Sequence, residues 1–282
     1  MSTSERPIAV LGAGTLGRRI ALMFATRGGA VRLFDASADA LAAARTYIDE
    51  ALPAVLSTVP GSSPAALGFG DDVGAAVADA WLVVESLPER IDLKRGVFAE
   101  LERLAPADAV LASNSSSYPT SELLEAVTTG ERVLNMHFFM PPRIRAVELM
   151  SSGRTDRAVL DRLLAVLPTY GLTPFEAKAQ SVGFIYNRIW AAIKRESLSV
   201  AAEGVATPEE IDRLFMMVLG TADGPFRMMD RVGLDIVLDI ENHYTATREG
   251  LPDSPRQLLR EYLEQGRLGR KSGRGFYDYG AE

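Results

Sequence analysis

The glycine-rich segment near the start of the chain, residues 8–35, constrains the fold more than any other feature. An apolar run at residues 8–11 predicts a buried strand, and it leads directly into the turn Gly12–Gly17. Helical spacing of apolar residues follows, and a second apolar run at residues 30–34 ends at Asp35. A strand, a glycine turn, a helix, a second strand and an acid in this order predict a βαβ unit that binds a dinucleotide.

The glycines and the acid each have a physical role in such a site. Gly12 permits a tight turn, Gly14 lets the backbone approach a pyrophosphate, and Gly17 lets the helix pack closely on the strand. Asp35 lies 18 residues beyond Gly17, where a carboxylate accepts a hydrogen bond from a ribose 2′-OH, and no cation follows it to hold a 2′-phosphate. The cofactor predicted is therefore NAD. The turn residues expected to contact it are Gly12, Ala13, Gly14, Thr15, Leu16 and Gly17.

The composition excludes several classes of protein. A net charge of −7 gives no indication of binding to nucleic acid or to an anionic membrane. The chain has no cysteine, so it has no disulfide, thiolate metal site or cysteine nucleophile, and no metal is expected. The N-terminus lacks a basic and apolar signal region, and no apolar run is long enough to span a membrane. We therefore expect a cytoplasmic protein.

Strand and helix patterns alternate through the first part of the chain, and only helical periodicity remains beyond it. The alternation predicts an α/β fold with a Rossmann-type, doubly wound, mostly parallel sheet. Residues 57–70, rich in Ser, Pro and Gly, are expected to form a loop. We predict an NAD-binding domain over residues 1–180 and an all-α domain for substrate binding and dimerisation over residues 181–282. Helices of the second domain are expected at 183–203, from Thr207 onward, at 224–249 and at 254–265.

Three polar clusters are candidates for the chemistry. A serine-rich run at residues 113–117 follows a predicted strand, although a polar turn accounts for it equally well. His137 ends the predicted strand 132–138, and Glu148 lies in the next strand. An acid in an apolar strand is costly unless paired, and it would orient the imidazole and increase its basicity. The pair predicts a general base for an alcohol proton. Asn187 begins the first helix of the second domain, where it is either functional or an ordinary cap.

Taken together, these motifs resemble the short-chain L-3-hydroxyacyl-CoA dehydrogenase family, which includes 3-hydroxybutyryl-CoA dehydrogenases. The resemblance is carried by Gly12–Gly17, Ser113–Ser117, His137–Phe139, Val147–Glu148, Gly183–Arg188, Gly224–Phe226, Asp230–Asp235 and Gly269–Tyr277. It extends over nearly the whole chain. It implies NAD-dependent interconversion of a 3-hydroxyacyl and a 3-ketoacyl thioester, and a homodimer built on the helical domain.

The resemblance also implies roles for individual residues. In the catalytic set, His137 is the base, Glu148 its partner, Ser116 the ligand of the substrate oxygen, and Asn187 a donor that polarises this oxygen. Positions that line the cofactor in the family are matched by Glu89, Lys94, Ser116 and Lys271.

Two departures from the family concern the substrate. Met140–Pro142 stands where the family has Asn-Pro after its His-Phe-Phe motif, so we expect a changed substrate. The family's lysine-rich arm, which holds coenzyme A phosphates, is cut short, and no Lys or Arg occurs at residues 46–89. Arg143 and Arg145 are candidates for binding a free carboxylate, with a solvated basic loop as the alternative. Candidates to replace the lysines are Arg18, Arg19 and Arg45, although the first two are expected to be surface residues of the first helix.

Three alternatives to a coenzyme A thioester dehydrogenase remain open. In the first, the substrate is a free 3-hydroxy acid or one bound to a carrier protein. In the second, the chain is a hydroxyisobutyrate-type dehydrogenase with Lys194 on the first long helix as the catalytic residue, although the His137–Glu148 pair argues against this. In the third, the chain is a non-catalytic NAD(H)-binding protein.

Overall fold

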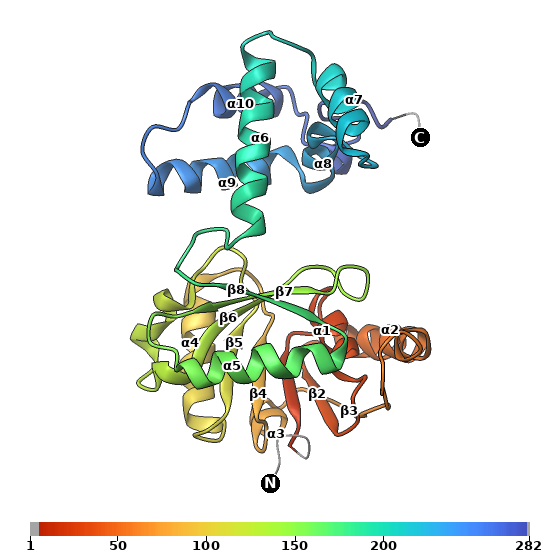
Figure 1. Cartoon of the computed structure of the whole chain (residues 1–282), viewed down its shortest axis with the longest axis vertical. Coiled ribbons are helices and arrows are strands. Elements are labelled where there is room, and N and C mark those ends of the chain that lie inside the picture. The colour runs from red at the N-terminus through yellow and green to blue at the C-terminus, as the bar shows by residue number, and fades with distance from the viewer. Residues whose placement is uncertain (1–5, 281–282) are drawn as a thin grey trace. The chain divides into compact units, whose positions relative to one another are not determined.

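The computed structural model describes residues 6–280, apart from the side chain of Thr247 (Figure 1). Contacts within the chain divide it into two compact units, Met1–Ile185 and Tyr186–Glu282. We call them the sheet unit and the helical unit. The boundary between the units lies where the first helix of the second unit begins. Among the described residues, all the strands come before this boundary and only helices follow it.

The sheet unit contains an eight-stranded sheet with the order β3-β2-β1-β4-β5-β6-β7-β8. All neighbouring strands are parallel except β6 and β7, which are antiparallel. This arrangement confirms the predicted α/β fold with a mostly parallel sheet. The strands are β1 (Ile8–Leu11), β2 (Ala30–Phe34), β3 (Ala66–Gly70), β4 (Leu82–Glu85), β5 (Val110–Ser113), β6 (Val133–Phe138), β7 (Ala146–Ser151) and β8 (Thr173–Ala177).

Helices cover both faces of the sheet, as the apolar strands require. Ile8 and Val10 of β1 belong to one core with side chains of α1, α2 and α5, whereas Ala9 and Leu11 belong to a second core with α3 and α4. The helices are α1 (Gly17–Phe24), α2 (Ala38–Leu56), α3 (Val73–Val77), α4 (Ile91–Leu104) and α5 (Arg157–Val166), with 3-10 turns at Thr120–Ala126, Gly130–Arg132 and Leu167–Tyr170. The alternation of side chains along a strand therefore divides the core into two layers.

Part of the segment predicted to be a loop is a strand. Residues 66–70 form β3, which pairs with β2 along the edge of the sheet. The prediction was wrong here because Gly68 and Gly70 interrupt the apolar pattern and the edge position leaves β3 largely exposed. The short helix α3 was also missed, although Asp72 caps it by accepting a hydrogen bond from the N–H of Ala75.

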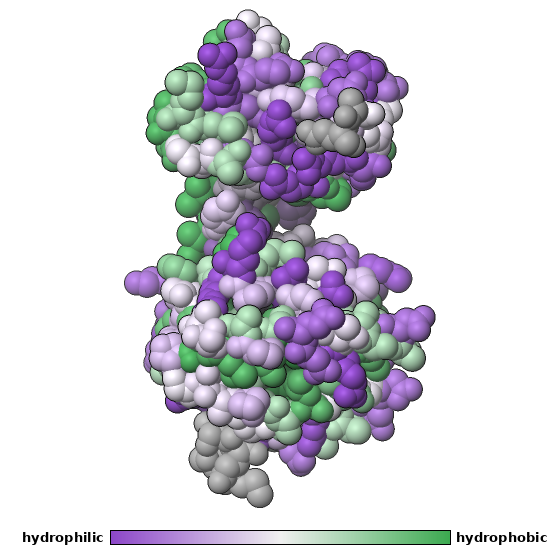
Figure 2. Space-filling model, turned by 90° about the vertical axis from the view of Figure 1, so that its right-hand side faces the viewer, coloured by the Kyte–Doolittle hydropathy of each residue, from purple (hydrophilic) through white to green (hydrophobic). Residues whose placement is uncertain are grey.

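The helical unit consists of α6 (Tyr186–Ala202), α7 (Pro208–Leu219), α8 (Pro225–Val232), α9 (Leu234–Thr247), α10 (Ser254–Glu264) and the 3-10 turn Arg270–Ser272. Thr207 begins α7 with a capping box, as its sequence indicates. The segment 224–249, where helices were expected, contains α8 and α9, which are separated at Gly233 because it adopts a φ of +107°. No helix among the described residues is long and apolar enough to cross a membrane. Figure 2 shows one face of the surface, on which hydrophilic and hydrophobic residues are mixed.

Candidate active site

The glycine turn after β1 has the geometry that a phosphate-binding loop needs. Gly12 has a φ of +101°, and a Cβ there would lie 2.5 Å from the carbonyl oxygen of Ser86. A Cβ on Gly17 would collide with the carbonyl oxygen of Gly12, which shows how closely α1 packs on the turn. A Cβ on Gly14 would meet nothing within 4 Å. The backbone at Gly14 therefore has open space beside it, at the point where a pyrophosphate is expected to approach.

Asp35 is held against this turn. Its Oδ2 accepts a hydrogen bond from the N–H of Ala13 at 2.8 Å, and its Oδ1 accepts one from the N–H of Ser37 at 2.9 Å. Each carboxylate oxygen can accept a second hydrogen bond. The acid is thus fixed at the end of β2, where a ribose hydroxyl would reach it.

His137 and Glu148 form a buried pair. The antiparallel register of β6 and β7 places them directly opposite each other, and Nδ1 of His137 lies 2.9 Å from Oε2 of Glu148. The other carboxylate oxygen, Oε1, accepts a hydrogen bond from the N–H of Ile185 at 3.0 Å. Because Nδ1 faces the acid, Nε2 is the nitrogen available for a substrate proton.

Two aromatic rings fix the imidazole of His137. Phe184 stacks on it with ring centres 5.1 Å apart, and Phe139 packs against it at 4.9 Å. Phe184 has a φ of +53°, a strained conformation for a residue other than glycine. Strain of this kind persists only where surrounding contacts enforce it, so the surrounding structure holds the Phe184 ring in its place against His137.

Glu89 organises the serine loop that follows β5. Its Oε1 accepts hydrogen bonds from the hydroxyl of Ser115 at 2.6 Å and from the N–H groups of Ser116 and Ser117 at 3.2 and 3.0 Å. Burial opposes ionisation of Glu89, but the hydrogen bond from Ser115 and the charge of Lys94 outweigh it and hold the pKa of this carboxyl below its usual range. The side chain of Ser116 remains exposed.

Lys94 lies beneath this loop, and its ammonium is shared between two acids. Nζ lies 2.7 Å from Oε1 of Glu85 and 3.2 Å from Oε2 of Glu89. The hydroxyl of Ser113 donates to the other oxygen of Glu85 at 2.7 Å. Sequence reasoning singled out Lys94 and Glu89 but missed Glu85, although an acid at the end of an apolar strand was a visible signal.

Two of the predicted site residues belong to the helical unit. Asn187 is half-buried in the first turn of α6. Nζ of Lys271 lies 2.6 Å from both carboxylate oxygens of Asp235. Their roles stay predictions, whereas the sheet unit by itself brings together the glycine turn, Asp35 and the His137–Glu148 pair with the loop that carries Ser116.

The basic side chains singled out earlier have different environments. Arg145 donates to the hydroxyl of Thr58 at 2.5 Å and to the carbonyl oxygen of Pro142 at 3.3 Å, so it connects the loop after β6 to the end of α2. Arg143 is exposed. Lys194 is buried in the helical unit, and burial lowers its pKa to about 8 although the charge of Glu241 opposes this.

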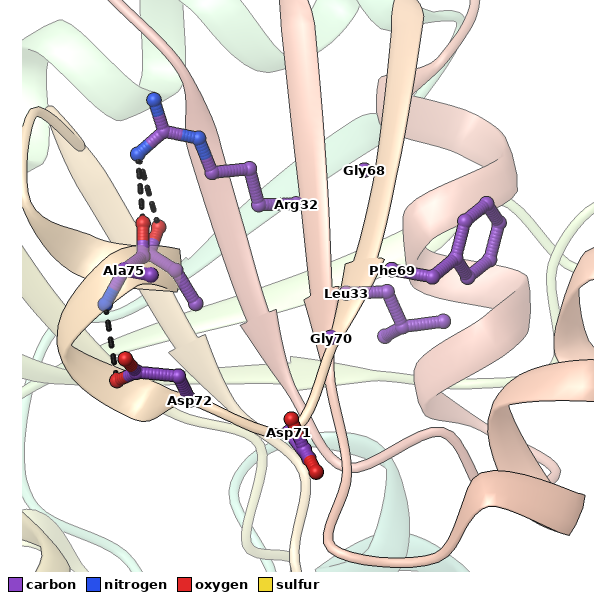
Figure 3. Close-up of a pocket in the computed structure, with 9 residues that line it drawn as sticks. Arg32, Leu33, Gly68, Phe69, Gly70, Asp71, Asp72 and Ala75 are labelled. Carbon is purple, nitrogen blue, oxygen red and sulfur yellow. Dashed lines mark hydrogen bonds between the residues drawn. The ribbon is translucent and has the colours of Figure 1, made fainter.

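An open pocket of about 300 Å³ lies between β2, β3 and α3, and it contains none of the predicted site residues (Figure 3). Nη1 of Arg32 donates to the carbonyl oxygen of Ala75 at 2.9 Å, and Asp72 caps the helix from the other side. These polar groups therefore form hydrogen bonds to the backbone of α3. Within residues 6–280, no group of three or more His, Asp or Glu side chains could hold a metal ion.

Comparisons with known proteins find matches over both units. The family described as 3-hydroxyacyl-CoA dehydrogenase, NAD binding domain, matches residues 7–180, and the one described as 3-hydroxyacyl-CoA dehydrogenase, C-terminal domain, matches residues 183–279. A probable 3-hydroxybutyryl-CoA dehydrogenase of Bacillus subtilis is 31% identical and covers 97% of this chain and 97% of that protein. A 5-formyl-3-hydroxy-2-methylpyridine 4-carboxylate 5-dehydrogenase of Mesorhizobium japonicum is 30% identical, with 98% and 92% covered. The crystal structure of (S)-3-hydroxybutyryl-CoA dehydrogenase from Ralstonia eutropha matches with a TM-score of 0.86 at 28% identity, with 98% and 99% covered.

Proposed function

Because this chain belongs to the 3-hydroxyacyl-CoA dehydrogenase family, we propose that His137 is the general base of an NAD-dependent 3-hydroxyacyl oxidoreductase. The family, the enzyme class and the NAD cofactor expected from the sequence are confirmed. The observation that supports the role of His137 is its buried pair with Glu148, with Nδ1 and Oε2 at 2.9 Å.

The pair is suited to moving one proton. In the oxidative direction, the substrate hydroxyl gives its proton to Nε2 of His137 as the hydrogen on the same carbon leaves as hydride. Bound NAD would supply the acceptor for that hydride. Glu148 holds Nδ1–H in place and stabilises the imidazolium that forms, because an acid beside a histidine favours its charged form. We assign the substrate oxygen to Ser116 and Asn187, whose hydroxyl and amide can donate hydrogen bonds to it.

The cofactor is proposed to bind across the carboxyl ends of β1 and β2. The open space at Gly14 supports a pyrophosphate there, and the fixed carboxylate of Asp35 supports a ribose contact. Glu89 and Lys94 shape the serine loop beside it, and Lys271 is proposed as a further contact. The sheet unit would thus carry NAD, and the helical unit would contribute to substrate binding.

The test is NADH oxidation by the full chain with acetoacetyl-CoA, acetoacetyl-pantetheine and free acetoacetate, compared with His137→Ala. General-base catalysis accounts for about 10²- to 10⁴-fold in rate, so we expect kcat to fall by that factor for the preferred substrate. Equal rates for the two proteins would show that His137 is not the base.

A second candidate is a free or carrier-bound 3-hydroxy acid in place of a coenzyme A thioester. The observation that favours it is the absence of Lys and Arg from residues 46–89, where the resemblance led us to expect a phosphate-binding arm. The same three substrates decide between the candidates. No NADH oxidation with any of the three substrates would favour a specialised acyl chain or a non-catalytic NAD(H)-binding protein.

We also propose a homodimer formed through the helical unit. Leu214, Met217 and Val218 on α7 lie three and four residues apart, on one face of the helix, and are 64%, 74% and 72% exposed. A contiguous apolar stripe on a surface helix is typical of a subunit interface. Met217→Lys would then produce monomers in analytical ultracentrifugation. A cytoplasmic location, expected from the sequence, stays a proposal.

A further inference from the structure

We propose that Arg18 and Arg19 form a subsite for an oxyanion of the substrate, either a phosphate of its carrier or the carboxylate of a free acid. This inference rests on the proposed function, because it concerns the substrate of the same site. The two arginines would supply the positive charge that the lysine-rich arm supplies in the family, because residues 46–89 contain no Lys or Arg.

The two arginines share one aromatic ring. They follow the glycine turn on α1, and their guanidinium carbons lie 4.9 and 5.1 Å from the ring centre of Tyr47 on α2. Nη1 of Arg19 also donates to the Tyr47 hydroxyl at 2.9 Å. We call Arg18, Arg19 and Tyr47 the arginine cluster. Both arginines are half-buried on α1 and their Nε atoms are fully buried, so only part of each side chain is at the surface.

The arginine cluster has positive charge without a compensating acid. Over the described part of the chain, neither guanidinium forms an ion pair with a carboxylate, and the buried Nε of each has no hydrogen-bond partner. Two like charges side by side repel, and buried donors without acceptors are costly. A bound oxyanion would remove both penalties. Guanidinium groups match phosphate and carboxylate well, because their donors can bind two oxygens of one anion at once.

The position of the arginine cluster points to the substrate. Nη1 of Arg19 donates to the carbonyl oxygen of Pro141 at 3.0 Å, and Pro141 lies four residues beyond His137. The arginine cluster therefore contacts the loop that follows His137, the proposed general base. The cofactor phosphates, by contrast, are proposed to bind the backbone N–H groups of the Gly12–Gly17 turn. Arg145 in the same loop is already engaged with Thr58.

Arg18→Met is the cleanest variant for a test. Arg18 forms no side-chain hydrogen bond with any residue from 6 to 280 that the structure describes, so its loss leaves the contact between Arg19 and Pro141 in place. Arg45 stacks on Phe69 at 4.3 Å, but it is itself a candidate for binding the anion. Arg162→Met is therefore the matched control, because Arg162 lies on α5 and stacks on Trp81 at 4.4 Å, beside the start of β4. Both variants remove one positive charge and one cation–π contact.

The first readout is direct binding, which does not depend on turnover. Calorimetric titrations of the full chain saturated with NAD would use free coenzyme A and free acetoacetate as probes. We expect Arg18→Met to weaken one of them by about 10- to 100-fold, the size of a charged hydrogen bond, and Arg162→Met to change neither by more than about 3-fold. Weaker coenzyme A binding identifies a phosphate, and weaker acetoacetate binding identifies a carboxylate.

The second readout is kinetic. Arg18→Met should raise KM for the substrate by the same factor while kcat and KM for NADH stay within about 2-fold. A rise in KM for NADH alone would assign the arginine cluster to the cofactor and overturn the inference. Equal binding of both probes by the variant and the original chain, or no binding of either, would overturn it as well. Failure of the proposed function is separate, because it is measured with His137→Ala.

Discussion

Glu148 in the sheet unit and Glu241 in the helical unit are both buried acids paired with a basic side chain, yet their second oxygens differ. Oε1 of Glu148 accepts a hydrogen bond from the N–H of Ile185. Oε2 of Glu241 accepts a hydrogen bond from Nε of Arg195 at 2.7 Å, but its Oε1 is buried and has no hydrogen-bond partner among the described residues, and the same holds for Nη2 of Arg195.

The difference follows from the backbone. Loops at the ends of strands have N–H groups that the sheet does not use, and these can satisfy a buried acid. The interior N–H groups of a helix are already bonded within it, so a buried acid between helices depends on other side chains. Glu85 follows the same rule as Glu148, because its oxygens accept from Lys94, the N–H of Leu87 and the hydroxyl of Ser113. Glu148 and Glu85 are thus held more completely than Glu241. The helical unit's buried Asp212 and Asp230 follow the same rule, because each accepts hydrogen bonds from two backbone N–H groups that no helix uses.

Lys94→Met should have the largest effect on stability. It would leave Glu85 buried without its cation, and breaking a buried pair from one side costs about 3–5 kcal/mol. Urea unfolding at pH 7 would measure the loss. Lys178→Met, which removes an exposed lysine of the same unit, is the control and should stay within about 0.5 kcal/mol. A small loss for Lys94→Met would mean that backbone and serine donors alone satisfy Glu85.

Glu148→Gln should affect activity more than stability. The amide can still accept from the N–H of Ile185, but it cannot stabilise an imidazolium at His137. We expect kcat to fall by about 10²-fold, while the free energy of unfolding changes by less than about 1 kcal/mol. Steady-state kinetics and urea unfolding of the same preparation would separate these effects. An unchanged kcat would reduce the pair to a structural role.

Lys194→Met should stabilise the protein, because burial disfavours the ammonium of Lys194. Its pKa falls from 10.5 to about 8 in the folded chain, where Glu241 and Arg195 are the charged groups that act on it. The folded state therefore binds fewer protons than the unfolded state between pH 8 and 10.5, so stability rises with pH across that range. Below pH 8 the full penalty remains, on the order of 3 kcal/mol at most. Met at this position should gain about 1–3 kcal/mol at pH 7, with no gain at pH 10.5 in thermal unfolding. A variant less stable than the original chain at pH 7 would contradict this.

The periodic spacing of apolar residues predicted those parts of the fold in which each strand or helix has a clear pattern of its own. The strand, turn and helix around Gly12–Gly17 were foreseen because each element has its own periodicity. The edge strand β3 was not, since its glycines give no such signal. The pair of His137 and Glu148 was inferred from the cost of an unpaired acid, but the antiparallel register that joins them is a property of the whole sheet. Arg18 and Arg19 were named from the sequence as candidates to replace the lysines, but their contacts with Tyr47 and Pro141 depend on how α1 packs against α2 and the loop after β6, which no local pattern gives.

The smallest effect is expected where both members of the helical pair are removed together. Arg195→Met with Glu241→Leu deletes the pair along with its unpartnered Nη2 and Oε1, so the loss of the ion pair is offset by the loss of two buried unmet groups. At pH 9.5, where Lys194 is mostly neutral, we expect the free energy of unfolding to change by less than about 1 kcal/mol. Arg195→Met alone should cost about 3 kcal/mol, because it leaves Glu241 charged and buried. Urea unfolding of the single and double variants gives the coupling energy between them. A double variant as unstable as the single one would mean that Glu241 is held as completely as Glu148 and Glu85, and the contrast between Glu241 and the acids that accept backbone N–H bonds would fail.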